Sequence, residues 1–254
     1  MSQRLSFETS GRGRVPLICV HGWACNGGQF TELRGLLADD FRVFRLDLPG
    51  HGKTPLENFK PGFESYARAI TEFCIEQKLE RPVFLGHSMG GVLCLIAAAA
   101  GVIQPRAVIN LDGTLPAAAR LTGVYPALEA LLAAPDFREQ FAGVVRKSFF
   151  LETERDARCD AIVQTMCSAP EAVLRFLPEQ AGDLRPEEIL PNVLCPVLYV
   201  GAAQPRFDAD KAASLIPHFT FEQIPEAGHF LHVYAVDKLA KILLRFLTSI
   251  SAVQ

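Results

Sequence analysis

The sequence has no excess of charge of either sign and no long hydrophobic run. Its 254 residues include 25 lysines and arginines against 28 aspartates and glutamates, for a net charge of −3. A nucleic-acid-binding surface needs a concentrated basic face, so we expect no nucleic acid as partner. The longest apolar stretch, residues 90–100, is shorter than the roughly eighteen residues of a membrane span. The start of the chain also lacks the pattern of a secretory signal, and we therefore expect no membrane partner.

Paired cysteines are also lacking. The chain has seven cysteines and no C-x-x-C spacing, and most of them lie inside apolar segments: Cys19, Cys25, Cys74, Cys94, Cys159, Cys167 and Cys195. This pattern indicates small buried side chains in a reducing compartment, and therefore a cytoplasmic protein. No phosphate loop, dinucleotide fingerprint or cluster of metal ligands occurs, so we expect neither a cofactor nor a metal.

Short apolar segments alternate with helical patterns along most of the chain. The apolar segments predict strands over 17–20, 43–46, 83–85, 107–111, 197–200 and 219–224, and a further strand-like segment follows Arg4. Helical patterns occur at 29–37, 63–78, 89–100, 209–216 and 236–249. The alternation predicts an α/β fold, with a mostly parallel twisted sheet covered by helices on both faces.

The alternation stops between residues 113 and 192. Helical segments such as 126–133 and 137–150 follow one another there without a convincing strand, and prolines, among them Pro178, punctuate them. We interpret 113–192 as a helical cap inserted into a core formed by 1–112 and 193–254. Its phenylalanines could line a lid over the site, or could simply anchor its helices to one another.

The strand expected at 83–85 runs into Gly86-His87-Ser88-Met89-Gly90-Gly91, and an apolar helix follows at once. This is the G-x-S-x-G pattern in a strand–turn–helix context, which is typical of a serine nucleophile. A serine on so sharp a turn is strained, and glycines on either side remove the steric conflict. The backbone N–H of Met89, at the start of the helix, would then face an oxyanion on the substrate.

With these residues the sequence resembles the α/β-hydrolase family over nearly its whole length outside the insertion. The resemblance extends to His21-Gly22-Trp23 and to the loop Asp47–Gly52. It implies that the backbone N–H of Trp23 is the second oxyanion donor, and the Trp23 ring is expected to form a wall of the pocket. We expect His21, Asp47 and His51 to brace turns instead of reacting.

A serine nucleophile needs a base, and six histidines are present. His229 follows the last predicted strand and precedes the final helix, which is where the family's catalytic histidine lies. His218 falls in a connection on the opposite edge of the sheet, and His232 lies in or beside the next helix. We therefore predict that His229 is the base.

The acid partner is displaced from the position that the resemblance implies. After the strand at 197–200, Gln204 stands where the family has an aspartate. Asp112, at the end of the strand at 107–111, is one replacement, and some members of the family carry their acid there. Asp208 is another, although it reads better as a helix cap, and the site could also have no acid. We predict Asp112 as the acid.

The predicted reaction is hydrolysis of a small, fairly apolar ester, thioester, lactone or amide through Ser88, His229 and Asp112. With its displaced acid, the sequence also resembles the cofactor-free dioxygenases of this fold, which act on N-heteroaromatic substrates such as quinolones. In that alternative a His229–Asp112 dyad deprotonates the substrate and Ser88 only binds it. A ligand receptor without catalysis is the third possibility. The partner is a small molecule in every case, and the sequence leaves monomer and homodimer open.

Overall fold

A seven-stranded sheet forms the centre of the computed structural model, which describes residues 4–113, 128, 130–205 and 208–251. Its strand order is β1-β3-β2-β4-β5-β6-β7, and all neighbours are parallel except β1 and β3. The strands are β1 (Ser6–Ser10), β2 (Val15–Val20), β3 (Phe41–Asp47), β4 (Val83–His87), β5 (Ala107–Leu111), β6 (Val197–Gly201) and β7 (Phe219–Gln223). The mostly parallel sheet expected from the sequence is thus confirmed.

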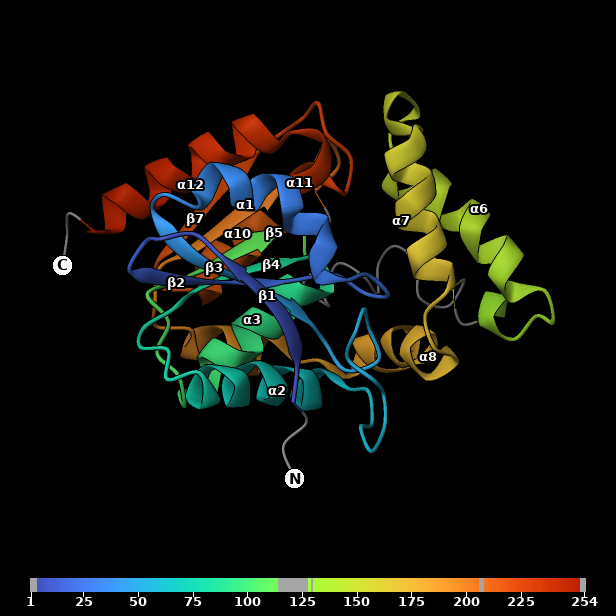
Figure 1. The fold of residues 1–254 in the computed structure, drawn as a ribbon, viewed down its shortest axis with the longest axis horizontal. Helices are drawn as coiled ribbons and strands as arrows, with labels where there is room; N and C mark the ends of the chain where they lie inside the picture. The colour runs from blue at the N-terminus through green and yellow to red at the C-terminus, as the bar shows by residue number, and fades with distance from the viewer. Residues whose placement is uncertain (1–3, 114–127, 129, 206–207, 252–254) are drawn as a thin grey trace.

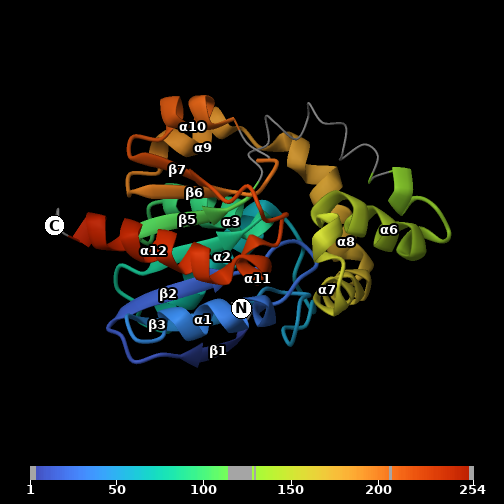
Figure 2. The same ribbon diagram turned by 90° about the horizontal axis from the view of Figure 1, so that it is seen from above.

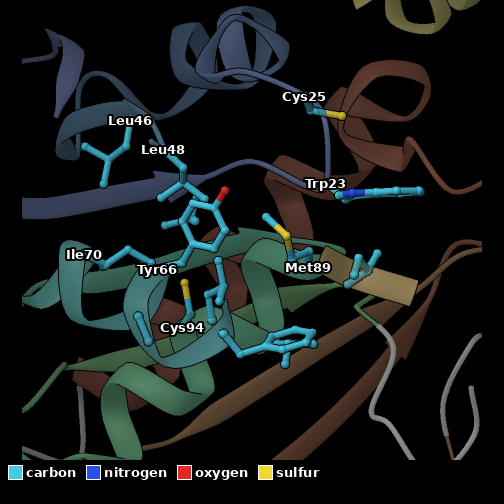
Figure 3. Packing of buried hydrophobic residues seen from close by; sticks show 14 of the residues in the cluster. Trp23, Cys25, Leu46, Leu48, Tyr66, Ile70, Met89 and Cys94 are labelled. Atoms are coloured by element: carbon cyan, nitrogen blue, oxygen red, sulfur yellow. The ribbon is translucent and has the colours of Figure 1, made fainter. Parts of the chain in front are cut away.

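Helices cover both faces of the sheet (Figures 1 and 2). On one face lie α2 (Phe63–Glu76) and α3 (Met89–Ala99), and on the other lie α1 (Thr31–Leu37), α11 (Leu231–Tyr234) and α12 (Val236–Ser251). Every residue of β4, β5 and β6 is buried, as expected for strands between two helical layers. Figure 3 shows the core on the α2–α3 face, where Trp23 and Met89 pack in one hydrophobic cluster with Tyr66 and Cys94.

A helical insertion lies between β5 and β6, and its part at 137–180 lies beyond one end of the sheet (Figures 1 and 2). It contains α6 (Phe137–Phe149), η2 (Glu152–Glu154), α7 (Ala157–Cys167), α8 (Glu171–Gln180), η3 (Ala181–Asp183), α9 (Pro186–Ile189) and η4 (Leu190–Asn192). The part at 137–180 lies at the carboxyl ends of the parallel strands, whereas α9 and η4 pack against α3. The helix expected over 126–133 falls partly outside the described residues.

The helix ends differ slightly from the sequence expectation. The helix expected over 29–37 begins with a 3-10 turn, η1 (Gly27–Phe30), before α1. The α2 helix ends two residues earlier than expected because Lys78 has a φ of 52°, which no helix residue adopts. Pro178, expected to separate helices, lies inside α8. Its position in the last turn limits the loss to one late hydrogen bond.

The remaining helix, α10 (Ala209–Leu215), joins β6 to β7 as expected. No helix of the described residues is both long enough and apolar enough to cross a membrane.

Candidate active site

Ser88 occupies a strained turn between β4 and α3. Its φ of 53° and ψ of −121° lie outside the regions that non-glycine residues favour, and its side chain is only partly buried. A Cβ on Gly86 would lie 2.3 Å from the backbone of Gly90, and one on Gly90 would lie 2.2 Å from the carbonyl oxygen of Val20. The glycines on either side of Ser88 therefore let strand and helix approach closely enough to hold the turn.

Asp112 and His229 form a buried pair at the carboxyl ends of the strands. His229 follows β7 and donates from Nδ1 to Asp112 Oδ2 over 2.7 Å. The Asp112 carboxylate is fully buried, and its Oδ1 accepts from the backbone N–H of Ala202 at 3.1 Å and from the Tyr199 hydroxyl at 3.4 Å. Donation from Nδ1 leaves the lone pair of a neutral imidazole on Nε2, which is the nitrogen that can take a proton.

Two backbone contacts bring Ser88 beside this pair. The Ser88 N–H donates to Leu111 O over 2.9 Å, so Ser88 lies next to the start of the Asp112 turn. His87, the residue before the serine, donates from Nε2 to His229 O over 2.9 Å, and the two imidazole rings lie 4.6 Å apart. The three residues predicted for catalysis therefore meet at one edge of the sheet.

The turn after β2 places Trp23 against the same site. A Cβ on Gly22 would lie 3.2 Å from Ser88 Cβ, so the His21-Gly22-Trp23 turn is in contact with the serine. Among the described residues, no acceptor is found for the backbone N–H of Trp23 or of Met89. Both amides are thus available to an oxyanion.

The ring of Trp23 is buried between the core and the insertion. Its Nε1–H donates to Val173 O of α8 over 2.7 Å, and the ring meets Phe141 of α6 edge-on at 5.3 Å. Phe150 and Phe176 are also buried, and Phe176 packs on Tyr66 of α2. These aromatic side chains anchor the insertion to the core, whereas the sequence suggested that they line a lid or anchor the helices of the insertion to one another.

The other histidines near the site brace turns. His21 Nε2 accepts from the Leu48 N–H at 3.0 Å, and burial lowers the pKa of His21 to about 4. His51 Nε2 accepts from the Ala24 N–H at 3.2 Å, and burial, with some repulsion from His21, lowers its pKa to about 3. Both side chains are neutral at pH 7, and their expected structural roles are confirmed.

Two histidines considered as alternative bases are placed differently from His229. His218 is exposed, and its carbonyl accepts from the N–H of Val197 at the amino end of β6, away from the site. His232 is fully buried 4.2 Å from the His87 ring, and this burial lowers its pKa well below the usual value. The Asp112 carboxylate bonds the imidazole of His229 instead.

The usual position of the acid, Gln204, and the alternative acid, Asp208, both lie on the surface. Gln204 is exposed, and Asp208, also exposed, accepts from the Lys211 N–H at 2.9 Å as the N-cap of α10. Of these three positions, Asp112 is the one whose carboxylate bonds His229. Cys25 is buried, and burial raises the pKa of its thiol to about 12, which removes it as a nucleophile at neutral pH.

Sequence reasoning missed two side chains that support the pair. Tyr199 is a buried residue of β6 whose hydroxyl reaches Asp112, and Glu154 is a buried carboxylate of the insertion bonded to Gly228 N–H. Tyr199 carries a weak signal, because a polar hydroxyl inside an apolar strand calls for a partner. Glu154 carries none, because its partner lies 74 residues away in the sequence.

No group of three or more histidine, cysteine, aspartate or glutamate side chains within the described part of the chain is arranged to hold a metal ion. The chemistry available at this edge of the sheet is that of a hydroxyl, an imidazole, a carboxylate and two free amides. These groups can transfer protons and stabilise a developing negative charge on oxygen.

Comparison with known proteins gives relatives along the whole chain. A probable serine hydrolase of Drosophila melanogaster is 34% identical over 105 residues, which cover 39% of this chain but only 31% of that protein. A pimeloyl-[acyl-carrier protein] methyl ester esterase of Xanthomonas oryzae pv. oryzae is 27% identical over 269 residues, covering 97% of this chain and 100% of the relative.

Solved structures share the fold. A hydrolase from Oleispira antarctica superposes with a TM-score of 0.85 at 17% identity, over 97% of this chain and 95% of the other. The model of the family described as Alpha/beta hydrolase family matches residues 17–242. The chain therefore belongs to the alpha/beta hydrolase family.

Proposed function

We propose that this protein is a serine hydrolase that cleaves a carboxylic ester of a small, fairly apolar acid, with Ser88 as nucleophile, His229 as base and Asp112 as acid partner. The observation that carries the proposal is the 2.7 Å hydrogen bond from His229 Nδ1 to the buried Asp112 carboxylate, beside the strained Ser88 turn. The family membership and the ester hydrolase among the relatives support the same reaction. Thioesters, lactones and amides remain within the proposed substrate class.

In the first half of the reaction, Ser88 Oγ attacks the ester carbonyl carbon while His229 Nε2 takes the hydroxyl proton. The carbonyl oxygen becomes an oxyanion, which accepts hydrogen bonds from the backbone N–H groups of Trp23 and Met89. When the bond between the carbonyl carbon and the alkoxide oxygen breaks, the imidazolium gives its proton to that oxygen, and the group leaves as the alcohol. Asp112 holds the imidazole in the required tautomer and stabilises its positive charge throughout.

In the second half, water replaces the alcohol and attacks the acyl-enzyme, with His229 again taking the proton. Collapse of this second intermediate releases the acid and returns the proton to Ser88 Oγ. Loss of one amide of the oxyanion hole would cost about 10²- to 10³-fold in rate, but these donors are backbone groups that substitution does not remove. The serine and histidine are therefore the residues to change in a test.

The test combines labelling with turnover. A fluorophosphonate should label the wild-type protein, and Ser88→Ala should abolish both labelling and hydrolysis of a short-chain ester. His229→Ala should slow both by several orders of magnitude. Oxygen uptake with a 3-hydroxy-4-oxoquinoline that survives Ser88→Ala but not His229→Ala would contradict the proposal and indicate the cofactor-free dioxygenase reaction. Ligand binding without turnover of any ester would instead indicate a receptor.

A further inference from the structure

Glu154 is a buried carboxylate of the insertion that the proposed reaction does not use. It closes the η2 turn, only 4% of its surface is exposed, and its Oε2 accepts from the Leu151 N–H at 2.9 Å. Its Oε1 accepts from the Gly228 N–H at 2.8 Å, across from the insertion to the core. Glutamates are rarely buried to this extent unless their oxygens are hydrogen-bonded. Here each oxygen bonds a backbone amide, and one of those amides belongs to the residue before His229.

The contact is a close one that depends on glycine. A Cβ on Gly228 would lie 2.3 Å from Glu154 Oε2 and 3.0 Å from Phe149 O. Side-chain carbons do not approach oxygen atoms that closely, so any larger residue at position 228 would displace the carboxylate. The carboxylate therefore lies directly against the backbone of the turn that carries the proposed base.

Phe149, at the end of α6, adds two contacts to the same turn. Its carbonyl accepts from the His229 N–H at 2.9 Å, and its ring lies 4.8 Å from the His229 imidazole. Tyr234, which follows the turn in α11, donates from its hydroxyl to Glu154 O over 2.7 Å. The backbone of the turn is thus bonded to residues 149–154 of the insertion, whereas the imidazole is bonded to Asp112 of the core.

We propose that Glu154 is a positioning residue for His229, acting through the backbone of Gly228 and making the alignment of the base depend on docking of the insertion. The inference rests on the proposed function, in which His229 is the base. A carboxylate fits because the N–H groups of Leu151 and Gly228 both donate, and a carboxylate accepts at both oxygens. A glutamine has one accepting oxygen, so its amide group would face a donor and one of the two bonds would be lost.

Glu154→Gln is the variant that tests this role, with Glu152→Gln as its matched control. Glu152 lies two residues away in the same η2 turn, but its side chain is 91% exposed. A displacement of the base by a fraction of an ångström to 1 Å lowers kcat by about 10- to 100-fold. We expect that loss in Glu154→Gln with KM within about twofold of wild type, and we expect wild-type constants in Glu152→Gln.

A second measurement does not depend on turnover. The His229 Nδ1 proton, shared with Asp112, should give a downfield proton NMR signal, and Glu154→Gln should shift or broaden it. A folded Glu154→Gln protein with unchanged kcat and an unchanged signal would overturn the inference. Equal losses in the Glu152→Gln control would overturn it as well, because they would show a general effect of charge in the turn.

If Glu154→Gln does not fold, Gly228→Ala serves as the second variant. It keeps the carboxylate but pushes it away, so kcat should fall with little change in KM. In the double variant Glu154→Ala/Gly228→Ala the 2.3 Å approach to the carboxylate is gone and only the 3.0 Å approach to Phe149 O remains. Gly228→Ala should therefore lower kcat less when Glu154 is absent than when it is present. A Gly228→Ala penalty that is the same with and without Glu154 would refute the contact.

Reference variants separate a failure of this inference from a failure of the proposed function. Activity that survives Ser88→Ala or His229→Ala overturns the proposed function itself. If both variants are inactive while Glu154→Gln behaves as wild type, the function stands and only the positioning role is lost.

Discussion

Replacing Asp112 with asparagine should abolish nearly all activity while leaving the fold intact. The asparagine has the same shape, and the Ala202 N–H and the Tyr199 hydroxyl, both donors toward Oδ1, hold its carbonyl oxygen in the position of Oδ1. Its amide group then points at His229 Nδ1, where the carboxylate oxygen accepted a hydrogen bond with an N···O distance of 2.7 Å. Because the amide donates, Nδ1 must become the acceptor, and the imidazole proton moves to Nε2.

An imidazole protonated on Nε2 cannot take the Ser88 proton, and the imidazolium also loses its negative partner. The loss expected from this tautomer change is about 10⁴-fold in kcat, which is about 5 kcal/mol in the activation barrier. The assay is hydrolysis of a p-nitrophenyl ester of a short acid, together with the rate of fluorophosphonate labelling and a thermal melt. If Asp112→Asn melts at the wild-type temperature but hydrolyses the ester more slowly, the substitution affects the reaction and not the stability of the fold.

Asp208→Asn is the matched control, because Asp208 is the exposed cap of α10 and asparagine caps helices about as well as aspartate. We expect its rate to stay within about twofold of wild type. An Asp112→Asn protein that melts normally and keeps more than about a tenth of the wild-type rate would refute the reasoning. A comparable loss in Asp208→Asn would refute the choice between the two carboxylates.

Three further predictions follow from the described contacts. Gly90→Ala places a Cβ 2.2 Å from a backbone carbonyl oxygen of β2, so we expect a loss of about 2 kcal/mol or more and a melting temperature lower by about 4–8 °C; unchanged melting would contradict the close packing. Tyr199→Phe removes one long hydrogen bond to Asp112, worth about 1 kcal/mol, and kcat should fall about fivefold; a normal rate would show that this hydroxyl does not support the carboxylate. Burial lowers the pKa of His21 to about 4 and that of His51 to about 3, whereas a histidine in the unfolded chain has a pKa of about 6.5. As the pH falls below about 6.5, these histidines therefore take up protons in the unfolded chain before they do so in the native state. Stability should therefore fall as the pH drops from 7 to 5, by about 2 kcal/mol for each histidine; a urea midpoint that is constant or rises over this range would contradict the burial argument.

The sheet and the serine turn could be predicted because their signals are local. Each buried parallel strand is a short apolar run. The sharp turn at Ser88 requires glycine at nearby positions, and the five adjacent residues Gly86-His87-Ser88-Met89-Gly90 show that pattern directly. The placement of His229 after the last strand followed from chain order. Because β4 pairs in parallel register with β2 on one side and β5 on the other, the turns that follow these three strands lie next to one another.

From the sequence alone, Asp112 was the preferred partner of His229, with Asp208 or no acid at all as the alternatives. The choice depends on where β5 ends relative to β6, and on the turn at Asp112, whose φ is 48° and whose carboxylate bonds the Ala202 N–H just beyond β6. Glu154 could not be predicted, because it lies in an irregular turn and its role depends on how a helical insertion docks on a distant loop. Long-range docking of this kind leaves no periodic pattern in the sequence.

The structure also explains how the chain tolerates glutamine at the position where the family resemblance implies an acid. The Asp112 N–H donates to Val200 O over 2.9 Å, and its carboxylate accepts from the Ala202 N–H just beyond the end of β6. The carboxylate of Asp112, the residue after β5, thus lies at the end of β6. It bonds Ala202, the first residue of the loop that leads to Gln204. Gln204 itself is exposed, whereas the carboxylate of Asp112 is buried and bonds the His229 imidazole. With Asp112 at the end of β6, the proposed site therefore has its acid without any contribution from position 204.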